Sequence, residues 1–348
     1  MNGQRGRGAQ IRPENRFRKE HSGSFHPEGI DNAEQPDVRT RIFEEDAAGL
    51  INEVKSQDLG IPYSMNPYQG CEHGCAYCYA RTTHEYYGFD AGLDFESRIV
   101  VKRNAATLLE RELMAASWRP APIMLSGNTD CYQPVERQLG ITRKLLEVLV
   151  RYRNPVGVIT KNSLILRDLD LLKDLASENL VHVMISITTL DEDLRRRLEP
   201  RTATAARRLQ VISELTAAGI PTGVMVAPII PGINQHEIPA IMEAAAQHGA
   251  MRAGMTVVRL NGSIGAVFRD WLEKHYPERA EKVMRQVAAL HGGDVEDTRP
   301  GRRIMGAGTE AEIIHRLFQV ARARHFRDRN FPPYNLTRFR RGGMLPLF

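Results

Sequence analysis

The sequence predicts an α/β protein built on a partial, TIM-like (β/α)6 barrel. Three observations favour this fold. Short apolar segments rich in Val and Ile alternate with helical patterns through the middle of the chain. The alternation is repeated often enough to require parallel strands joined by right-handed crossovers. No G-x-G-x-x-G segment opens any of the helices, which disfavours a dinucleotide-binding fold.

The six strand candidates are β-branched runs, and the helix candidates between them carry apolar residues at i, i+3 and i+4 spacing. Leu145, Leu146 and Leu149 illustrate the helical spacing. The predicted strands are 61–66, 123–126, 156–160, 181–188, 222–228 and 254–260. The predicted helices are 105–117, 142–152, 168–177, 205–218 and 237–247. Six such strands suit an open barrel better than the closed eight-stranded form.

The barrel is predicted to span residues 46–262, with a helical C-terminal region over 263–327. In that region Thr309 and Glu312 are predicted to form a capping box for a helix over 311–324. Residues 1–45 are rich in Arg, Gly, Pro, Asn and Ser, which predicts a disordered basic arm. Residues 328–348 are predicted to form a flexible basic tail.

Composition limits the class of protein. The 348 residues are 42% apolar, which is enough for a substantial core, and the net charge of +5 is moderately basic. The opening residues hold no apolar run, and no stretch approaches the length of a membrane span. Three of the four cysteines lie within one short segment, as is typical of a reducing compartment. A cytoplasmic protein without a membrane partner is therefore expected.

That segment is the main candidate for chemistry. Cys71, Cys75 and Cys78 have the spacing C-x3-C-x2-C. Three thiolates can hold three irons of a cubane cluster and leave the fourth iron open to a small molecule. Gly70 and Gly74 supply the freedom in φ that a backbone wrapped around a cluster needs. The cysteines follow the first predicted strand, at the face where parallel barrels assemble their active sites.

The spacing alone leaves other metal centres open. A zinc ion could bind the same three cysteines together with His73 or the remote Cys131. An electron-transfer cluster with Cys131 as its fourth ligand is a second alternative.

The end of the chain combines arginines with aromatic residues. Residues 316–341 hold eight arginines against a single acid, Asp328. The interleaved aromatic residues are Phe326, Phe331, Tyr334 and Phe339. This composition suits phosphate contact with base stacking, or else a solvated helix face followed by a loose tail.

The motif C-x3-C-x-(aromatic)-C, with Tyr77 as the aromatic residue, resembles the radical S-adenosylmethionine (radical SAM) superfamily over about residues 40–318. Within it the chain is most similar to the spore-photoproduct-lyase-like branch, also called DNA repair photolyase-like. The segments that carry this similarity are Asn66-Pro-Tyr-Gln-Gly-Cys-Glu-His-Gly-Cys, Thr129-Asp-Cys-Tyr-Gln-Pro, Ile159-Thr-Lys161, Glu199-Pro-Arg201 and Ala227-Pro-Ile-Ile-Pro-Gly232.

The resemblance implies two cofactors. Cys71, Cys75 and Cys78 would bind a [4Fe-4S] cluster, and S-adenosylmethionine would chelate its open iron. Reduction of the cluster would cleave S-adenosylmethionine to methionine and a 5′-deoxyadenosyl radical. The electron would come from a donor such as flavodoxin or ferredoxin.

The resemblance also implies contacts to S-adenosylmethionine. The backbone around Tyr77 would lie near the adenine, Lys161 would meet the methionyl carboxylate, and Ser186 would contact the ribose. Residues Ser126, Gly127 and Asn128 occupy the place of the glycine-rich motif that contacts the methionyl amine, although the family's acidic residue is absent there.

Two further residues have more than one interpretation. Arg201 could clamp a carboxylate bidentately, or it could pair with Glu199 or Asp193. The lyase uses a cysteine after its second strand to return a hydrogen atom to the product. Gly127 aligns with that cysteine here, and Cys131 follows four residues later. Cys131 could donate hydrogen, bind a metal or simply pack.

The last five residues, Met344-Leu-Pro-Leu-Phe348, resemble the C-terminal peptides by which bacterial replication and repair proteins bind the sliding clamp. Leu345, Leu347 and Phe348 match the apolar anchors, while Met344 replaces the usual glutamine. The alternative is a chain end folded back on the domain.

These features together predict a radical SAM enzyme that acts on a nucleic acid, DNA or RNA. One alternative is the same chemistry on a peptide or small molecule. An alternative of another class is a zinc or iron–sulfur module that binds nucleic acid without catalysis.

Overall fold

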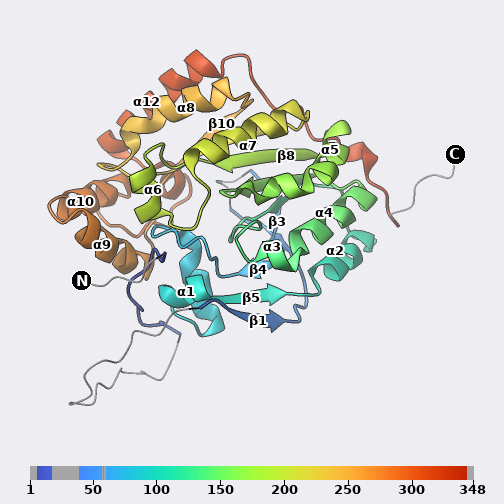
Figure 1. The fold of residues 1–348 in the computed structure, drawn as a ribbon, viewed down its shortest axis with the longest axis horizontal. Helices are drawn as coiled ribbons and strands as arrows, with labels where there is room; N and C mark the ends of the chain where they lie inside the picture. Colours follow the sequence, from blue (N-terminus) through green and yellow to red (C-terminus); the bar gives the residue numbers. More distant parts are fainter. Residues whose placement is uncertain (1–5, 18–38, 57, 59, 343–348) are drawn as a thin grey trace.

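The computed structural model describes residues 6–17, 39–56, 58 and 60–342 (Figure 1). Its main sheet has the strand order β10-β9-β8-β7-β6-β3-β2, in which β2 is antiparallel to β3 and the other neighbours are parallel. In chain order these strands are β2 (Ile51–Glu53), β3 (Tyr63–Met65), β6 (Ile123–Leu125), β7 (Val156–Thr160), β8 (Val181–Ser186), β9 (Thr222–Ile229) and β10 (Ala253–Val257). The six predicted strands are confirmed, and the sheet is open at β10, as in a partial barrel.

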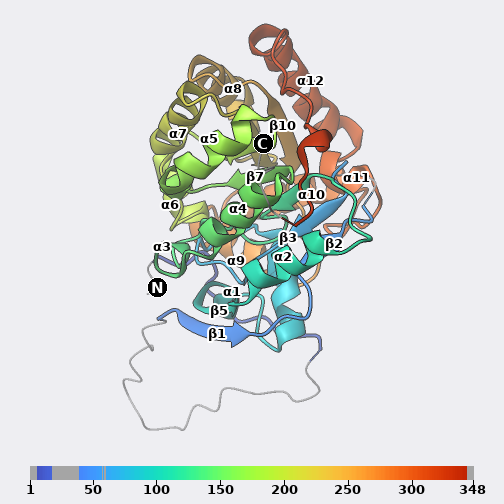
Figure 2. The same ribbon diagram turned by 90° about the vertical axis from the view of Figure 1, so that its right-hand side faces the viewer.

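Helices cover the outer face of this sheet (Figures 1 and 2). They are α2 (Ala105–Met114), α4 (Ile141–Tyr152), α5 (Leu169–Ser177), α7 (Ala205–Ala217) and α8 (Ile238–Gln247). All five were predicted. Their apolar stripes pack against side chains such as Val158, Val183 and Ile185, which point out of the barrel and are buried. No helix in the described part of the chain is long and apolar enough to cross a membrane.

The inner face of the barrel differs from the outer one. Ser64, Met124, Gly157 and His182 are register partners across β3, β6, β7 and β8, so they share the inner face. On the same face, further along the strands, lie Met184 and Met225. The serine, the methionines and His182 remain partly exposed. The inner wall is therefore reached by solvent and is lined largely by methionine.

A second sheet has the order β1-β5-β4, with β1 (Arg41–Glu45) parallel to β5 (Arg98–Lys102) and β4 (Tyr68–Gln69) antiparallel to it. Residues 6–17 form an extended segment, called here the N-terminal strap, whose backbone amides donate hydrogen bonds to the side chain of Glu96. The prediction of disorder over 1–45 is therefore wrong for the described residues 6–17 and 39–45. Sequence composition missed this order because the contacts are long-range.

The remaining elements are short helices around the barrel and a helical C-terminal region. The short helices are η1 (Tyr79–Tyr87), α1 (Leu93–Ser97), α3 (Glu136–Leu139), η2 (Ser163–Asp168), α6 (Glu192–Leu198) and η3 (Gln235–Glu237). The C-terminal region holds α9 (Ile264–His275), α10 (Ala280–Leu290), α11 (Arg302–Met305), α12 (Gly308–His325) and η4 (Leu336–Arg338). The predicted capping box is wrong, because Thr309 lies inside α12 and the N-cap residue is Ala307, without a side-chain cap.

Residues 326–342 cross the N-terminal ends of the barrel strands and are called here the C-terminal strap (the red segment at the right of Figure 1). Arg329 Nη1 donates to the carbonyl oxygens of Ala246 and Ala250, at 2.8 and 2.9 Å. Further along, the Arg340 amide donates to Tyr152 O at 2.8 Å. The described part of the predicted flexible tail is therefore an ordered strap.

The aromatic residues of the C-terminal strap close the bottom of the barrel. The Tyr334 ring stacks on His182 with centroids 3.9 Å apart, and Phe331 lies 4.5 Å from the same ring. A Cβ atom added to Gly157 would lie 3.3 Å from the Tyr334 hydroxyl. Base stacking is therefore the wrong interpretation for these two rings, because they pack against the protein. The predicted clamp-binding peptide, with Leu345, Leu347 and Phe348, lies outside the described residues.

Candidate active site

The cysteine loop, residues 70–78, lies beyond the C-terminal end of β3, as predicted. Gly70 and Gly74 adopt positive φ angles of 81° and 66°. A Cβ atom added to Gly70 would lie 3.0 Å from the carbonyl oxygens of Arg98 and Phe95. The Cys71 amide donates to that Phe95 oxygen at 2.8 Å. Both glycines are thus required by backbone conformation, as the sequence indicated.

The three thiols of the loop occupy one region of the molecule. Cys71 and Cys75 are buried and Cys78 is partly exposed. Burial raises the pKa of the Cys71 thiol, and the neighbouring Asp130, Cys75 and Cys78 raise it further. Among the described residues, no three His, Cys, Asp or Glu side chains converge on a single metal ion. A cubane needs no such convergence, because each thiolate binds a different iron. The donor set of three thiols therefore fits a cluster with an open iron.

The two candidates for a fourth ligand make other contacts. The His73 ring lies 3.2 Å from Asn162 Nδ2 through Nε2 and 3.4 Å from Asp130 Oδ2 through Nδ1. Cys131 is fully buried in the main core, and its amide donates to Ser126 Oγ at 2.7 Å. This burial supports the packing interpretation of Cys131, and its role as a hydrogen donor stays a prediction.

The N-terminal strap lies directly on the cysteine loop. The amides of Gly8 and Ala9 donate to the two carboxylate oxygens of Glu96, at 3.1 and 2.7 Å. A Cβ atom added to Gly8 would lie only 1.6 Å from Gly74 O. Only glycine allows the two backbones to approach so closely.

Glu96 also joins the strap to a buried arginine. Arg81 Nη2 lies 2.5 Å from Glu96 Oε1, and neither side chain is exposed. The same guanidinium donates to the Cys75 carbonyl oxygen. The strap, the ion pair and the cysteine loop thus form one hydrogen-bonded unit.

A second buried network lies beside Tyr77. The Tyr77 hydroxyl donates to Glu199, and Thr188 Oγ1 donates to the same carboxylate at 2.6 Å. Arg208 Nη2 pairs with Glu199 Oε2 at 2.6 Å. Burial opposes ionisation of Glu199, but the charges of Arg208 and Lys161 outweigh it and lower the pKa of Glu199 to about 2. The Tyr77 side chain thereby ties the loop to Thr188, which follows β8, and to Glu199.

Lys161 follows β7 at the rim of the barrel, and its amide donates to Asp130 Oδ2 at 2.8 Å. Its ammonium lies 5.9 Å from the centroid of the Tyr77 ring. Within the described part of the chain this ammonium forms no hydrogen bond or ion pair, and solvent reaches its nitrogen. A cation beside the cysteine loop that has no direct partner among the described residues suits a carboxylate ligand.

The loop after β6 contains the other predicted contacts. Ser126 has a positive φ of 78°, which is unusual for a residue other than glycine. Gly127 O accepts a hydrogen bond from the Tyr79 hydroxyl at 2.6 Å. The Asn128 amide group donates to Gln69 Oε1 at 3.0 Å. The loop is thus tied to the segments on both sides of the cysteines, and its contacts to a cofactor stay a prediction.

Ser186 and Arg201 are placed differently from each other. Ser186 ends β8 on the inner face, opposite Met225, and its carbonyl oxygen accepts from Arg208 at 2.9 Å. Arg201 Nη1 lies 3.6 Å from Glu72 Oε1, so neither predicted acidic partner pairs with it. Those acids are held by other arginines, Glu199 by Arg208 and Asp193 by Arg196.

Sequence reasoning missed several functional candidates. Arg81 lies three residues after Cys78, but its burial shows only in the fold. Arg208 lies on α7, and nothing in a helical pattern marks it as the partner of Glu199. Tyr79 and Arg259 meet at the rim although 180 positions separate them in the sequence. None of these pairings has a local sequence signal.

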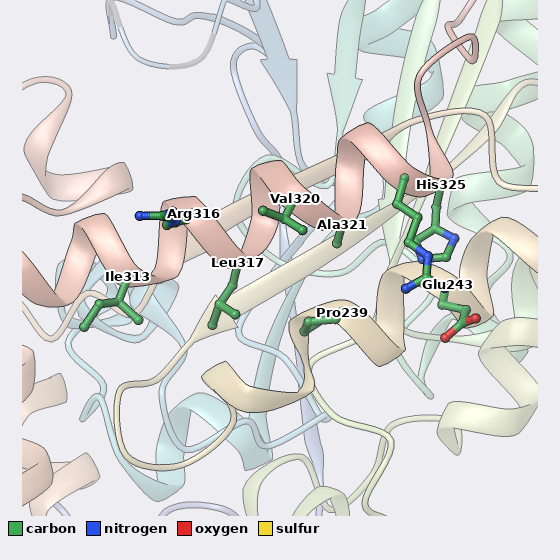
Figure 3. A pocket seen from close by; sticks show the side chains of 9 residues that line it. Pro239, Glu243, Ile313, Arg316, Leu317, Val320, Ala321 and His325 are labelled. Atoms are coloured by element: carbon green, nitrogen blue, oxygen red, sulfur yellow. The ribbon is translucent and has the colours of Figure 1, made fainter.

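A surface groove lies on two helices away from the cysteine loop (Figure 3). Its volume is about 350 Å³, and it runs between α8 and α12, where Ile313, Leu317 and Val320 contribute apolar side chains. The groove holds no thiol, so we place the chemistry at the cysteine loop.

An open parallel barrel with three cysteines on the loop after its first barrel strand defines a class of iron–sulfur proteins. Residues 65–245 match the model of the Radical SAM superfamily. The chain belongs to this superfamily, whose members use a [4Fe-4S] cluster and S-adenosylmethionine.

Curated relatives share sequence with the barrel region. An uncharacterized protein of Mycobacterium bovis is 36% identical over 222 residues, which cover 63% of this chain and 65% of the relative. The chain thus matches less than two thirds of that relative's length. The radical SAM Nα-GlyT isomerase of Pseudomonas phage M6 is 27% identical over 218 residues, covering 62% of this chain and 43% of the isomerase.

Solved structures of spore photoproduct lyase have the same fold. The lyase complexed with dinucleoside spore photoproduct aligns with a TM-score of 0.61 at 16% identity, over 86% of this chain and 85% of the lyase. A variant with bound AdoMet and the same dinucleoside aligns with a TM-score of 0.60 at 15% identity, over 83% of this chain and 81% of the lyase. The predicted resemblance to that branch is confirmed at the level of the fold.

Proposed function

We propose that this protein is a radical SAM enzyme that reductively cleaves S-adenosylmethionine and acts on a nucleic acid. The observation that carries the proposal is the position of the three thiols, on one loop at the rim of a barrel whose inner wall is open. A bound, reduced cluster would supply one electron to the sulfonium, so that its S–C5′ bond would break to give methionine and a 5′-deoxyadenosyl radical. Cys71, Cys75 and Cys78 would hold the cluster, and Lys161, whose ammonium lies 5.9 Å from the Tyr77 ring centroid, would neutralise a carboxylate beside it.

The nucleic-acid part of the proposal is supported by the net charge of +5 and by the names of similar proteins. One structural neighbour was solved with a dinucleoside lesion, and a phage relative is a GlyT isomerase. The electron donor, with flavodoxin and ferredoxin as candidates, and a sliding clamp bound by residues 344–348 are proposed as partners.

The test is anaerobic reconstitution with iron and sulfide, followed by dithionite and S-adenosylmethionine. We expect about four irons and four sulfides per chain and formation of 5′-deoxyadenosine. Cys75→Ala should lose both the brown chromophore and the product. Cys131→Ala is the matched control, and it should keep both, because this thiol packs in the main core, in a different apolar cluster from the loop cysteines.

The outcomes separate the alternatives. One zinc per chain, or loss of the cluster in Cys131→Ala, would contradict the proposed enzyme. Cofactor cleavage that is stimulated by a peptide or small molecule and not by an oligonucleotide would keep the chemistry and change the substrate.

A further inference from the structure

Arg259 follows β10 at the C-terminal rim of the barrel, and it is the residue on which this inference rests. Its guanidinium carbon lies 4.4 Å from the centroid of the Tyr79 ring. Within the described residues the guanidinium forms no hydrogen bond or ion pair. Each of its nitrogens retains some solvent-accessible surface, although the residue as a whole is only partly exposed. In the part of the chain that the structure describes, its N–H donors therefore have no hydrogen-bond partner, and solvent reaches the guanidinium nitrogens.

The neighbouring charges do not neutralise Arg259. Asp58 is the nearby acid, but its carboxylate accepts from the Gly301 amide and pairs with Arg303 at 2.6 Å. Arg303 itself adds a like charge, and burial lowers the pKa of Arg259. A partly desolvated cation that forms no ion pair with any acid of the described residues is costly, and a bound anion offsets that cost.

Tyr79 gives this site a fixed geometry. It follows Cys78, the last cysteine of the loop, and its hydroxyl donates to Gly127 O at 2.6 Å. The ring therefore links the cysteine loop to the loop after β6 while remaining 44% exposed. A guanidinium stacked on such a ring is pre-organised for bidentate hydrogen bonding.

We propose that Arg259, held on Tyr79, binds a phosphate group of the substrate at the mouth of the barrel. Guanidinium matches phosphate bidentately. Below the rim, Met184 and Met225 offer an apolar wall for an uncharged ring, such as a nucleobase. The inference rests on the proposed function and deepens it, because it assigns the phosphate and the base of a nucleotide to separate parts of the site.

The experiment compares Arg259→Gln with the wild type and with Arg316→Gln. Arg316 is the matched control because it lines the α8–α12 groove, away from the cysteine loop. The probes are thymidylyl-thymidine, which has one phosphodiester, and thymidine, which has none. Binding to the reconstituted enzyme is measured by calorimetry at several salt concentrations.

We expect Arg259→Gln to weaken phosphodiester binding by about 10-fold to 100-fold. Its salt slope should fall by about one. Thymidine binding and the control variant should stay unchanged.

Two further measurements keep the result unambiguous. Arg259→Lys retains the positive charge but loses the planar guanidinium that can bind a phosphate bidentately. Its phosphodiester affinity should therefore fall between those of wild type and Arg259→Gln. The iron content of each variant should equal that of the wild type. The midpoint potential of the cluster is measured as well, because Cys78 and its cluster are the competing counter-charge for Arg259. If Arg259 serves a phosphate group, the loss of binding should exceed any change in the potential.

Equal phosphodiester binding by Arg259→Gln and wild type would overturn the inference and leave the proposed function standing. A shifted potential with unchanged binding would also overturn it, by assigning Arg259 to the cluster. A wild type that cleaves S-adenosylmethionine but binds neither probe would refute the nucleic-acid substrate, and the phosphate subsite with it.

Discussion

The carbonyl oxygen of Cys75 accepts two hydrogen bonds from Arg81, from Nε at 3.0 Å and from Nη2 at 2.8 Å. The remaining nitrogen, Nη1, donates to the carbonyl oxygens of Ala91 and Gly92. One fully buried arginine thus supports the middle of the cysteine loop, and Glu96 balances its charge. Arginine can do this because its planar fork offers five donors in fixed directions.

Arg81→Lys should destabilise the protein, because an ammonium cannot replace the fork and leaves buried carbonyl groups without donors. We expect the free energy of unfolding to fall by about 2 to 4 kcal/mol. Urea unfolding and the iron content after reconstitution measure the effect. Arg196→Gln is the control, because the exposed Arg196–Asp193 pair contributes less than about 1 kcal/mol. Similar losses in the two variants would contradict the role of Arg81.

Gly8→Ala should loosen the N-terminal strap from the cysteine loop. The added methyl group would meet Gly74 O, a backbone atom that cannot move aside. We expect faster removal of cluster iron by a chelator and faster bleaching in air, each by a few-fold. Gly49→Ala is the control, since its Cβ would meet only the end of the Glu112 side chain, at 3.3 Å. Equal rates in both variants would show that the strap does not protect the cluster.

Glu199→Gln should expose the cost of burying Arg208 without a charged partner, which we put at about 3 kcal/mol. Tyr77→Phe removes a single hydrogen bond to the same carboxylate and should cost about 1 kcal/mol. Both values come from urea unfolding at pH 7.

The Glu199→Gln effect should depend on pH. The folded-state pKa of Glu199 is lowered to about 2, from 4.5, so its contribution is fully present above pH 4.5 and is lost as the pH falls toward 2. The difference between wild type and variant should shrink over this range. A difference that stays constant with pH would contradict the assignment.

His182 should make the C-terminal strap sensitive to acid. Burial lowers the pKa of His182 to about 4, from 6.5, and the ring lies 2.9 Å from the carbonyl oxygen of Pro332. Between pH 6.5 and 4, His182 binds a proton when the C-terminal strap is detached and stays neutral when the strap is docked. Docking should therefore weaken as the pH falls, by at most about 1.4 kcal/mol per pH unit.

Hydrogen exchange of the Asn335 and Arg340 amides measures this docking, because they bond to Asn179 O and Tyr152 O across the strap contact. We expect protection, corrected for intrinsic rates, to fall between pH 7 and pH 5. His182→Gln lacks the titrating ring, so its protection should change less. The same decline in both proteins would assign the pH effect to another group.

The predicted strands and helices agree with the structure because each has a strong local signal. Residues 156–160 were predicted and observed with the same bounds, since a β-branched run between turns has few alternatives. The helix bounds differ by a few residues at most, as for 142–152 against Ile141–Tyr152. Capping gave a weaker signal, and Thr309 was misassigned for that reason.

The arginine-rich end of the chain shows what local patterns miss. Its composition suggested nucleic-acid contact or a loose tail. In the structure Arg329 caps the end of α8, and Arg341 donates to carbonyl groups after α2. Charge runs of this kind carry no information on which distant carbonyl groups need donors.

The sequence by itself determined the order of strands and helices and the three thiols at the end of the first barrel strand, because periodicity and motif spacing are local properties. Only the tertiary structure decided that Arg81 supports Cys75, that Glu199 pairs with Arg208, and that both straps are ordered. These contacts join residues far apart in the chain, and burial rather than residue type makes them strong.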